Sequence, residues 1–155
     1  MCKGVKNNIY YTRSDDAGGT WTTPAPLPGF DNTRWARGGG DDYFVDAKDS
    51  IVAIVTAGLG KDVVLWKSTD YGVNFTKIDI MDFGMAHWEI DQQTDTNGDG
   101  VTDTLDTNDG SITCLIDNSG MVHVWFGYAK VFSDGGTGTT FLPFVGALIY
   151  WDENV

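Results

Sequence analysis

The sequence predicts an all-β protein, and three observations favour this fold class. The 155 residues include 20 glycines, and we count 20 aspartates against two glutamates. Asp and Gly favour turns whereas Glu favours helices. Short apolar strands alternate with polar turns along the whole chain. Because 41% of the residues are apolar, the chain is long enough for one core and too short for two ordinary domains, so we expect a single domain over residues 1–155.

The first repeated element is a polar turn. Residues 14–21 and 68–75 both read S-x-D-x-G-x-(T/N)-aromatic, and each follows a short apolar strand, at residues 9–12 and 63–66. In such a turn the Asp accepts backbone N–H groups, the Gly takes a positive φ and the aromatic side chain packs beneath. We therefore expect a structural role for Ser14, Asp16, Gly18, Trp21, Ser68, Asp70, Gly72 and Phe75.

The second repeated element is a hairpin. Residues 45–55 match residues 116–126 at an offset of 71, each with a strand, a polar turn and a strand, and a further strand is expected at 147–151. With strands of a unit labelled A to D, the chain reads C, D, then A, B, C, D, then A, B, C. This order gives about two and a quarter four-stranded antiparallel units, at residues 1–30, 43–80 and 111–155. Tandem units of this kind build β-propellers, so the sequence predicts a partial β-propeller.

The two S-x-D-x-G segments resemble the Asp boxes, or BNR repeats, of sialidase-like β-propellers. In that family the box is a structural turn between the C and D strands. A sialidase-type hydrolase is expected to have an arginine triad, a Tyr and Glu nucleophile pair and an acidic Asp. The only arginines of this chain are Arg13, Arg34 and Arg37, and its only glutamates are Glu89 and Glu153. We therefore assign no catalytic residue. Whether the chain is an enzyme stays open, and these departures disfavour catalytic activity. An active chain would be a glycoside hydrolase of sialidase type.

Three long connections, residues 29–42, 81–110 and 127–144, are expected on one face of the units, where binding sites are usually built. The middle one contains an insertion at 91–110 in which D-T-N-G-D-G-V-T-D-T-L-D fits the calcium-loop pattern, with Asp in place of the final Glu. This loop resembles those of dockerin and EF-hand calcium repeats. Calcium takes oxygen ligands, and the expected set is Asp95, Asn97, Asp99, the Val101 carbonyl, Asp103 and Asp106. Residues 106–110 could extend the site to a second ion; the alternative is a solvated acidic loop without metal.

A ligand surface is a further candidate. Arg34 and Arg37 flank Trp35 in the first long connection, and Trp88 lies in the second. Guanidinium groups bind carboxylates and aromatic rings stack on sugars, so these residues could bind a glycan or a protein. The alternative is internal pairing of the arginines with neighbouring aspartates.

Charge and composition exclude several partners. A net charge of −12 opposes binding to nucleic acid and to anionic membranes. The chain has no apolar run long enough for a membrane span and no signal peptide. We expect an extracellular or cell-surface location, with any signal outside this chain. Cys2 and Cys114 could form one disulfide, or Cys114 is a buried free thiol.

Together these features favour a non-catalytic, calcium-stabilised segment of a secreted bacterial sialidase-like propeller, used for binding, adhesion or assembly. One alternative is a fragment of a secreted glycoside hydrolase. Another is a subunit of an extracellular fibre or larger complex. The expected partners are further propeller blades or neighbouring copies of the chain.

Overall fold

The computed structural model describes residues 9–30, 42–85, 88, 93–133 and 138–155. This part of the chain contains strands and turns and no helix. The strands are β1 (Tyr10–Tyr11), β2 (Ala25–Pro26), β3 (Tyr43–Lys48), β4 (Ile51–Thr56), β5 (Val63–Ser68), β6 (Thr76–Met81), β7 (Thr104–Ile116), β8 (Val122–Ser133), β9 (Thr139–Phe141) and β10 (Ala147–Asp152). A helix long and apolar enough to cross a membrane is not found among these residues.

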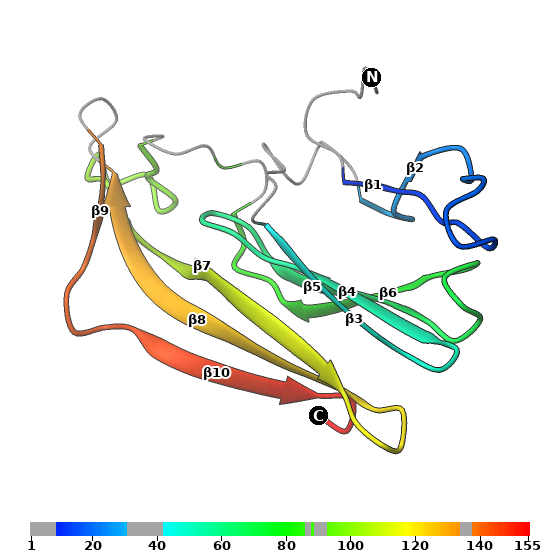
Figure 1. Ribbon diagram of the computed structural model, residues 1–155. Helices are drawn as coiled ribbons and strands as arrows, with labels where there is room; N and C mark the ends of the chain where they lie inside the picture. Colours follow the sequence, from blue (N-terminus) through cyan, green and yellow to red (C-terminus); the bar gives the residue numbers. More distant parts are fainter. Residues whose placement is uncertain (1–8, 31–41, 86–87, 89–92, 134–137) are drawn as a thin grey trace.

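The strands form three antiparallel sheets (Figure 1). The first sheet pairs β1 with β2, and the central sheet has the order β3-β4-β5-β6. The third sheet has the order β10-β8-β7, and β9 extends it by pairing with the far end of β8. The prediction of an all-β fold with four-stranded antiparallel sheets is therefore confirmed.

Both predicted hairpins form, and their turns differ in length. Lys48 pairs with Ile51 across a two-residue turn, whereas Ile116 pairs with Val122 across a five-residue turn. Two of the expected long connections are shorter than predicted. β7 already begins at Thr104 and β8 continues to Ser133, because the two strands pair with each other beyond the predicted hairpin, on both sides of a register shift between Asn108 and Ile112.

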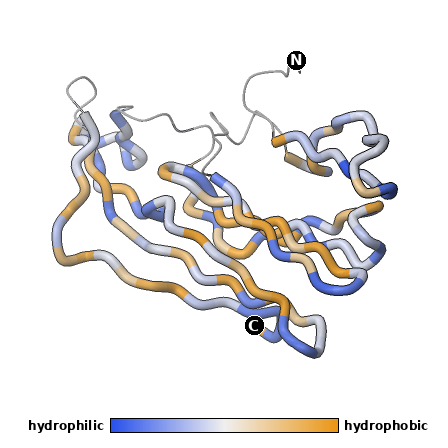
Figure 2. The backbone as a smooth tube through the Cα atoms, viewed as in Figure 1, coloured by the Kyte–Doolittle hydropathy of each residue, from blue (hydrophilic) through white to orange (hydrophobic). Residues whose placement is uncertain are grey.

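The central sheet is covered on both faces (Figure 2). One face packs against the third sheet through a core that includes Val55, Leu65, Val124 and Phe126. The opposite face packs against the first sheet around the fully buried Trp66, with side chains from residues 9–30. The three sheets are thus stacked face to face, as apolar faces require.

The two hairpins lie side by side with β3 and β7 running in the same direction (Figure 1). At the end of both strands, the Ile116 N–H donates to Asp46 Oδ2 at 2.7 Å and Lys48 Nζ donates to the Asp117 carbonyl at 3.0 Å. At their start, the Gly58 N–H donates to Asn108 Oδ1 at 2.8 Å. These contacts fix the register of one sheet on the other.

This arrangement corrects the 71-residue repeat alignment. That alignment equates Ala53 with Val124, and in two sheets stacked in parallel equivalent side chains point in the same direction. Ala53 and Val124 instead face each other across the shared core. The alignment is therefore out of phase by one residue in the second strands, β4 and β8, because the two hairpin turns differ by an odd number of residues.

Candidate functional site

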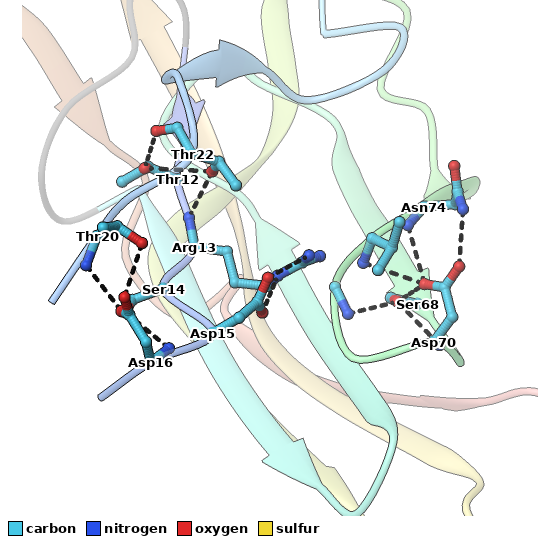
Figure 3. Close-up of polar contacts among 12 residues, drawn as sticks. Thr12, Arg13, Ser14, Asp15, Asp16, Thr20, Thr22, Ser68, Asp70 and Asn74 are labelled. Carbon is cyan, nitrogen blue, oxygen red and sulfur yellow. Dashed lines mark hydrogen bonds and ion pairs between the residues drawn. The ribbon is translucent and has the colours of Figure 1, made fainter. Parts of the chain in front are cut away.

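Residues 14–21 form a tight polar turn that we call the first serine-aspartate turn. The Ser14 hydroxyl accepts a hydrogen bond from the Gly18 N–H at 2.7 Å and donates to Asp16 Oδ1 at 2.8 Å. The Asp16 carboxylate accepts the N–H and the hydroxyl of Thr20, at 2.7 and 2.8 Å. The polar groups of this turn are thus bonded to one another (Figure 3).

Residues 68–75 form the second serine-aspartate turn, with the same pattern. The Gly72 N–H donates to the Ser68 hydroxyl at 2.9 Å, and that hydroxyl donates to Asp70 Oδ1 at 2.7 Å. The Asn74 N–H and side-chain amide donate to Asp70 at 2.9 and 2.7 Å (Figure 3). The sequence repeat therefore encodes a repeated three-dimensional turn.

Both aspartates are held as carboxylates. The pKa of Asp16 is lowered to about 2, chiefly by the hydrogen bond from the Thr20 backbone N–H. The pKa of Asp70 is also lowered to about 2, chiefly by the hydrogen bond from the Asn74 backbone N–H. A carboxyl group of such low pKa that already accepts several hydrogen bonds is a poor proton donor at neutral pH. The structure gives these two groups a turn-stabilising role.

The glycine and aromatic positions of the two turns differ in part from expectation. Gly18 and Gly72 have φ values of +92° and +78°, as predicted. Phe75 packs into the core and meets Tyr11 edge to face at a centroid distance of 5.0 Å. Trp21 lies beside its own turn, with a ring carbon 4.0 Å from the position that a Cβ of Gly18 would take, but the side chain is 64% exposed. The second turn has β1 beside it to supply a packing partner, whereas the first sheet has only two short strands.

The acidic loop closes on itself. The Asp103 N–H donates to the Thr94 carbonyl at 2.8 Å and the Asp103 carboxylate accepts the Thr96 N–H at 2.7 Å. The Asp95 carboxylate accepts the N–H groups of Gly98 and Gly100 at 2.7 and 2.8 Å. Hydrogen bonds from Thr96 lower the pKa of Asp103. Four of the predicted calcium ligands, Asp95, Asn97, Asp99 and Asp103, therefore lie in one compact turn with the Val101 backbone.

Asp106 is separated from this turn. It lies on β7, where Lys130 Nζ approaches Asp106 Oδ1 at 2.8 Å and the Tyr128 hydroxyl donates to it at 2.6 Å. The Lys130 bond is the main reason why the pKa of Asp106 is lowered. The structure gives no support to Asp106 as the residue that closes the calcium loop, because β7 begins at Thr104 and pairs this side chain with Lys130.

The expected second ion at residues 106–110 likewise gains no support from the contacts of these residues. Thr107 and Asn108 are fully buried. Thr107 Oγ1 accepts the Gly60 N–H at 2.8 Å, and the Asn108 amide donates to the Lys61 carbonyl at 2.7 Å. These side chains tie the β4–β5 connection to β7 and so act in sheet packing. The sequence pattern of alternating polar residues did not distinguish this buried role from a metal site.

The residues described here contain no group of three His, Cys, Asp or Glu side chains placed to hold a metal ion. In the acidic loop, the carboxylates of Asp95 and Asp103 instead accept backbone N–H groups. The donor set, all oxygen and on a turn with positive φ at Gly98 and Gly100, has the chemistry that calcium prefers. The residues that would hold an ion are Asp95, Asn97, Asp99, Asp103 and the Val101 carbonyl.

The predicted ligand surface is only partly described. Arg34, Trp35 and Arg37 lie outside the described residues. Trp88 is 5% exposed and belongs to a core with Leu105 and Val131, so it is not available to a ligand. A side chain on Gly60 would collide with the Trp88 ring at 2.0 Å, which shows how closely the backbone packs on it. Trp88 is therefore reassigned from ligand binding to packing.

A cavity of about 390 Å³ is lined by residues of the first sheet and of the second serine-aspartate turn. Its walls include Tyr11, Arg13, Thr22 and Phe75. The Arg13 guanidinium is already bound by the Asp15 carboxylate, through Nε at 2.7 Å and Nη2 at 2.9 Å. Because this ion pair neutralises the cation, the cavity offers no unpaired charge from Arg13 to a ligand.

Sequence reasoning missed a polar and aromatic cluster on the third sheet. His123 Nδ1 lies 2.7 Å from the Tyr150 hydroxyl, which donates to Asp152 Oδ2 at 2.8 Å. His123 Nε2 faces Asp117 Oδ2 at 3.5 Å, and the Trp125 and Tyr150 rings lie 5.3 Å apart. His123 and Tyr150 are 27 residues apart in sequence, so only the pairing of β8 with β10 brings these groups together.

Cys114 is a buried free thiol. Burial raises the pKa of Cys114 to about 12, with a smaller contribution from the Asp46 carboxylate. A thiol that stays protonated is a weak nucleophile and a weak metal ligand. The alternative of a buried hydrophobic cysteine is therefore the one that the structure supports; Cys2 lies outside the described residues.

Comparisons with protein-family models, with curated proteins and with solved structures gave no match.

Proposed function

We propose that this chain is a non-catalytic, calcium-stabilised segment of a sialidase-like β-propeller that serves binding, adhesion or assembly in a secreted or cell-surface bacterial protein. The observation that carries the proposal is the stacking of the central and third sheets with β3 and β7 in parallel. Four-stranded sheets repeated in this way are the building principle of propellers. Further sheets, from other blades or from neighbouring copies, are the expected partners.

The state of the acidic residues supports a structural role. Asp16 and Asp70 are bonded within their turns, and Glu153 is paired with Lys67. A glycoside hydrolase of the sialidase type needs carboxyl and arginine side chains directed at a substrate. In the described part of the chain, Arg13 is directed at Asp15 instead.

Calcium is proposed for the acidic loop. An ion held by Asp95, Asn97, Asp99, Asp103 and the Val101 carbonyl would neutralise the carboxylates of this loop in an acidic chain. Its role would be to fix the loop that leads into β7, whose residues Thr107 and Asn108 hold the β4–β5 connection. Calcium is therefore expected to stabilise the sheets and to take no part in a reaction.

The deciding experiment is an activity assay joined to a stability assay on the purified chain. A fluorogenic sialoside should not be hydrolysed, and millimolar calcium should raise the melting temperature. Turnover that disappears in the Arg37→Gln variant would overturn the proposal and favour the glycoside hydrolase alternative. The absence of any effect of calcium on melting would remove calcium from it.

A further inference from the structure

We propose that Asn97 is a site of spontaneous deamidation, and that the Asp95 carboxylate slows this reaction by holding the N–H group of Gly98. Asn97 and Gly98 form the only Asn-Gly pair among the 155 residues. The pair lies in the acidic loop ahead of β7, and both residues are exposed. The reaction needs no calcium and is therefore independent of the function proposed above.

Deamidation at an Asn-Gly pair needs only the chain and water. The backbone nitrogen of Gly98 attacks the side-chain carbonyl carbon of Asn97, and a succinimide ring forms. The Gly98 nitrogen loses its proton in this step, and the side-chain nitrogen of Asn97 leaves as ammonia. One water molecule then opens the ring at either of its carbonyl groups, which leaves aspartate or isoaspartate at position 97.

Glycine is the residue that hinders this attack least when it follows the asparagine. It has no Cβ beside the attacking nitrogen, and its backbone adopts conformations that other residues avoid. Gly98 has a φ of +75°, and a Cβ built on it would meet no atom within 4 Å beyond its chain neighbours. The surroundings of the pair are therefore open to water.

The Asn97 side chain is already turned towards the Gly98 peptide group. Asn97 Oδ1 accepts the Asp99 N–H at 2.9 Å. Such a bond closes a side-chain turn over the residue that lies between its two partners, and that residue is Gly98. The turn therefore holds the Asn97 carbonyl carbon near the nitrogen that attacks it.

Asp95 acts against the reaction. Its Oδ1 accepts the Gly98 N–H at 2.7 Å and its Oδ2 accepts the Gly100 N–H at 2.8 Å. The Gly98 nitrogen becomes a nucleophile only as it gives up this proton, and a carboxylate beside it disfavours the negative charge that develops there. A hydrogen bond to a charged acceptor must also break before the nitrogen can join the ring. The closed loop is thus the slowly reacting form.

Asn118 is an internal reference within the same chain. It precedes Ser119 in the β7–β8 turn, and its Oδ1 accepts a hydrogen bond from Lys48 Nζ at 2.6 Å. The Ser119 N–H donates to Asp117 Oδ1 at 2.8 Å. No contact joins this turn to Asp95 among the described residues, so the rate at Asn118 should respond to unfolding of the sheets and not to a substitution of Asp95.

Both products change the loop. Aspartate at position 97 adds a carboxylate to those of Asp95 and Asp99, which repel it. Isoaspartate lengthens the main chain by one methylene group and so displaces the Gly98 N–H from the Asp95 carboxylate. Deamidation therefore alters the loop that leads into β7, and it alters one of the oxygen donors proposed for calcium.

Peptide mapping by mass spectrometry on the aged, purified chain tests the proposal. The protein is kept at neutral pH and body temperature with a chelator, and aspartate and isoaspartate at position 97 are measured over time. The folded wild type should deamidate at Asn97 at least about tenfold more slowly than the chain unfolded in guanidinium chloride. Asp95→Ala should deamidate there at least about tenfold faster than the folded wild type, the rate change expected when a hydrogen bond to a charged group is lost.

Asp99→Ala is the matched control. It removes a carboxylate from the same loop, but Asp99 Oδ1 accepts the Val101 N–H at 2.8 Å and not that of Gly98. Its rate of deamidation at Asn97 should stay close to that of the wild type.

Absence of both products at Asn97 in the unfolded chain would overturn the site itself. A folded Asp95→Ala variant that deamidates at the wild-type rate would overturn the role of Asp95. Equal acceleration in Asp95→Ala and Asp99→Ala would do the same, because it would assign the effect to the total charge of the loop. A raised rate at Asn118 would show that a variant has unfolded. The wild type then decides, since equal rates at Asn97 in its folded and unfolded forms would overturn the protection.

Discussion

Lys67 and Glu153 link the central sheet to the third sheet. Lys67 Nζ lies 2.6 Å from Glu153 Oε2, and both side chains are largely buried. Lys67 also donates to the Gly120 carbonyl at 2.9 Å, while Glu153 accepts the Val122 N–H at 2.8 Å. One ion pair thus joins β5, the β7–β8 turn and the segment after β10. The two residues are 86 positions apart in sequence.

Removing one charge of this pair should destabilise the protein. We expect Glu153→Gln to lower the free energy of unfolding by about 1–3 kcal/mol, because a charged hydrogen-bonding partner is lost from a poorly hydrated site. Urea unfolding followed by circular dichroism measures it. Lys77→Gln is the control: Lys77 pairs with Asp79 at 2.8 Å in a more exposed position, and we expect a change below about 1 kcal/mol. Equal effects of the two substitutions would contradict the role given to Glu153.

The second serine-aspartate turn should tolerate substitution of its glycine less than the first. An alanine at Gly72 would place its Cβ 2.1 Å from the Tyr11 hydroxyl, whereas at Gly18 the nearest atom is 4.0 Å away. Both positions carry the positive-φ penalty of about 1–2 kcal/mol. Gly72→Ala should therefore lower the melting temperature more than Gly18→Ala. The Tyr11→Phe background should reduce the difference, and an unchanged difference there would show that the hydroxyl is not the cause.

Stability should depend on pH through Asp70. Its pKa is about 2 in the folded protein and about 3.9 in the unfolded chain. The folded-state pKa is the lower one, so this carboxylate stabilises the fold above pH about 3.9 and the contribution disappears as the pH falls towards 2. We expect Asp70→Asn to cost stability at pH 6 and progressively less on acidification, as measured by urea midpoints. A constant cost across that range would contradict this assignment.

Substitutions of Asp99 and of Asp106, which the sequence analysis placed in one calcium loop, should differ in their effect on calcium binding. Calorimetry should show that Asp99→Ala abolishes binding, because Asp99 lies in the acidic turn with Asp95. Asp106→Ala should bind calcium as the wild type does, because Asp106 is paired with Lys130 on β7. Loss of binding in the Asp106 variant would restore it to the ligand set and count against the structure of the loop.

Cys114 should be protected from thiol reagents until the protein unfolds. Its pKa near 12 keeps the thiolate fraction negligible at neutral pH, and the side chain is buried in the core between two sheets. In a Cys2→Ser background, labelling by a thiol reagent should rise along the urea unfolding curve measured by circular dichroism. Rapid labelling of the native protein would indicate that the two sheets separate locally.

The turns, strands and hairpins of this protein could be predicted from the sequence because they depend on local contacts. The S-x-D-x-G turns were predictable because their bonds join residues no more than four positions apart, as for Ser14 with Gly18 and Asp70 with Asn74. Strands and hairpins were predictable because alternation and turn residues act over a few positions. The order of the strands followed from these repeats.

Tertiary structure decided what depends on contacts distant in sequence. Asp106 has Lys130 as its partner because β7 pairs with β8, and Trp88 is buried because it packs with Leu105 and Val131. The cluster of His123, Tyr150 and Asp152 exists only through pairing of β8 with β10. Sequence alone determined which residues are polar or apolar and where the turns fall, whereas strand pairing, which sets the facing residues, decided their roles.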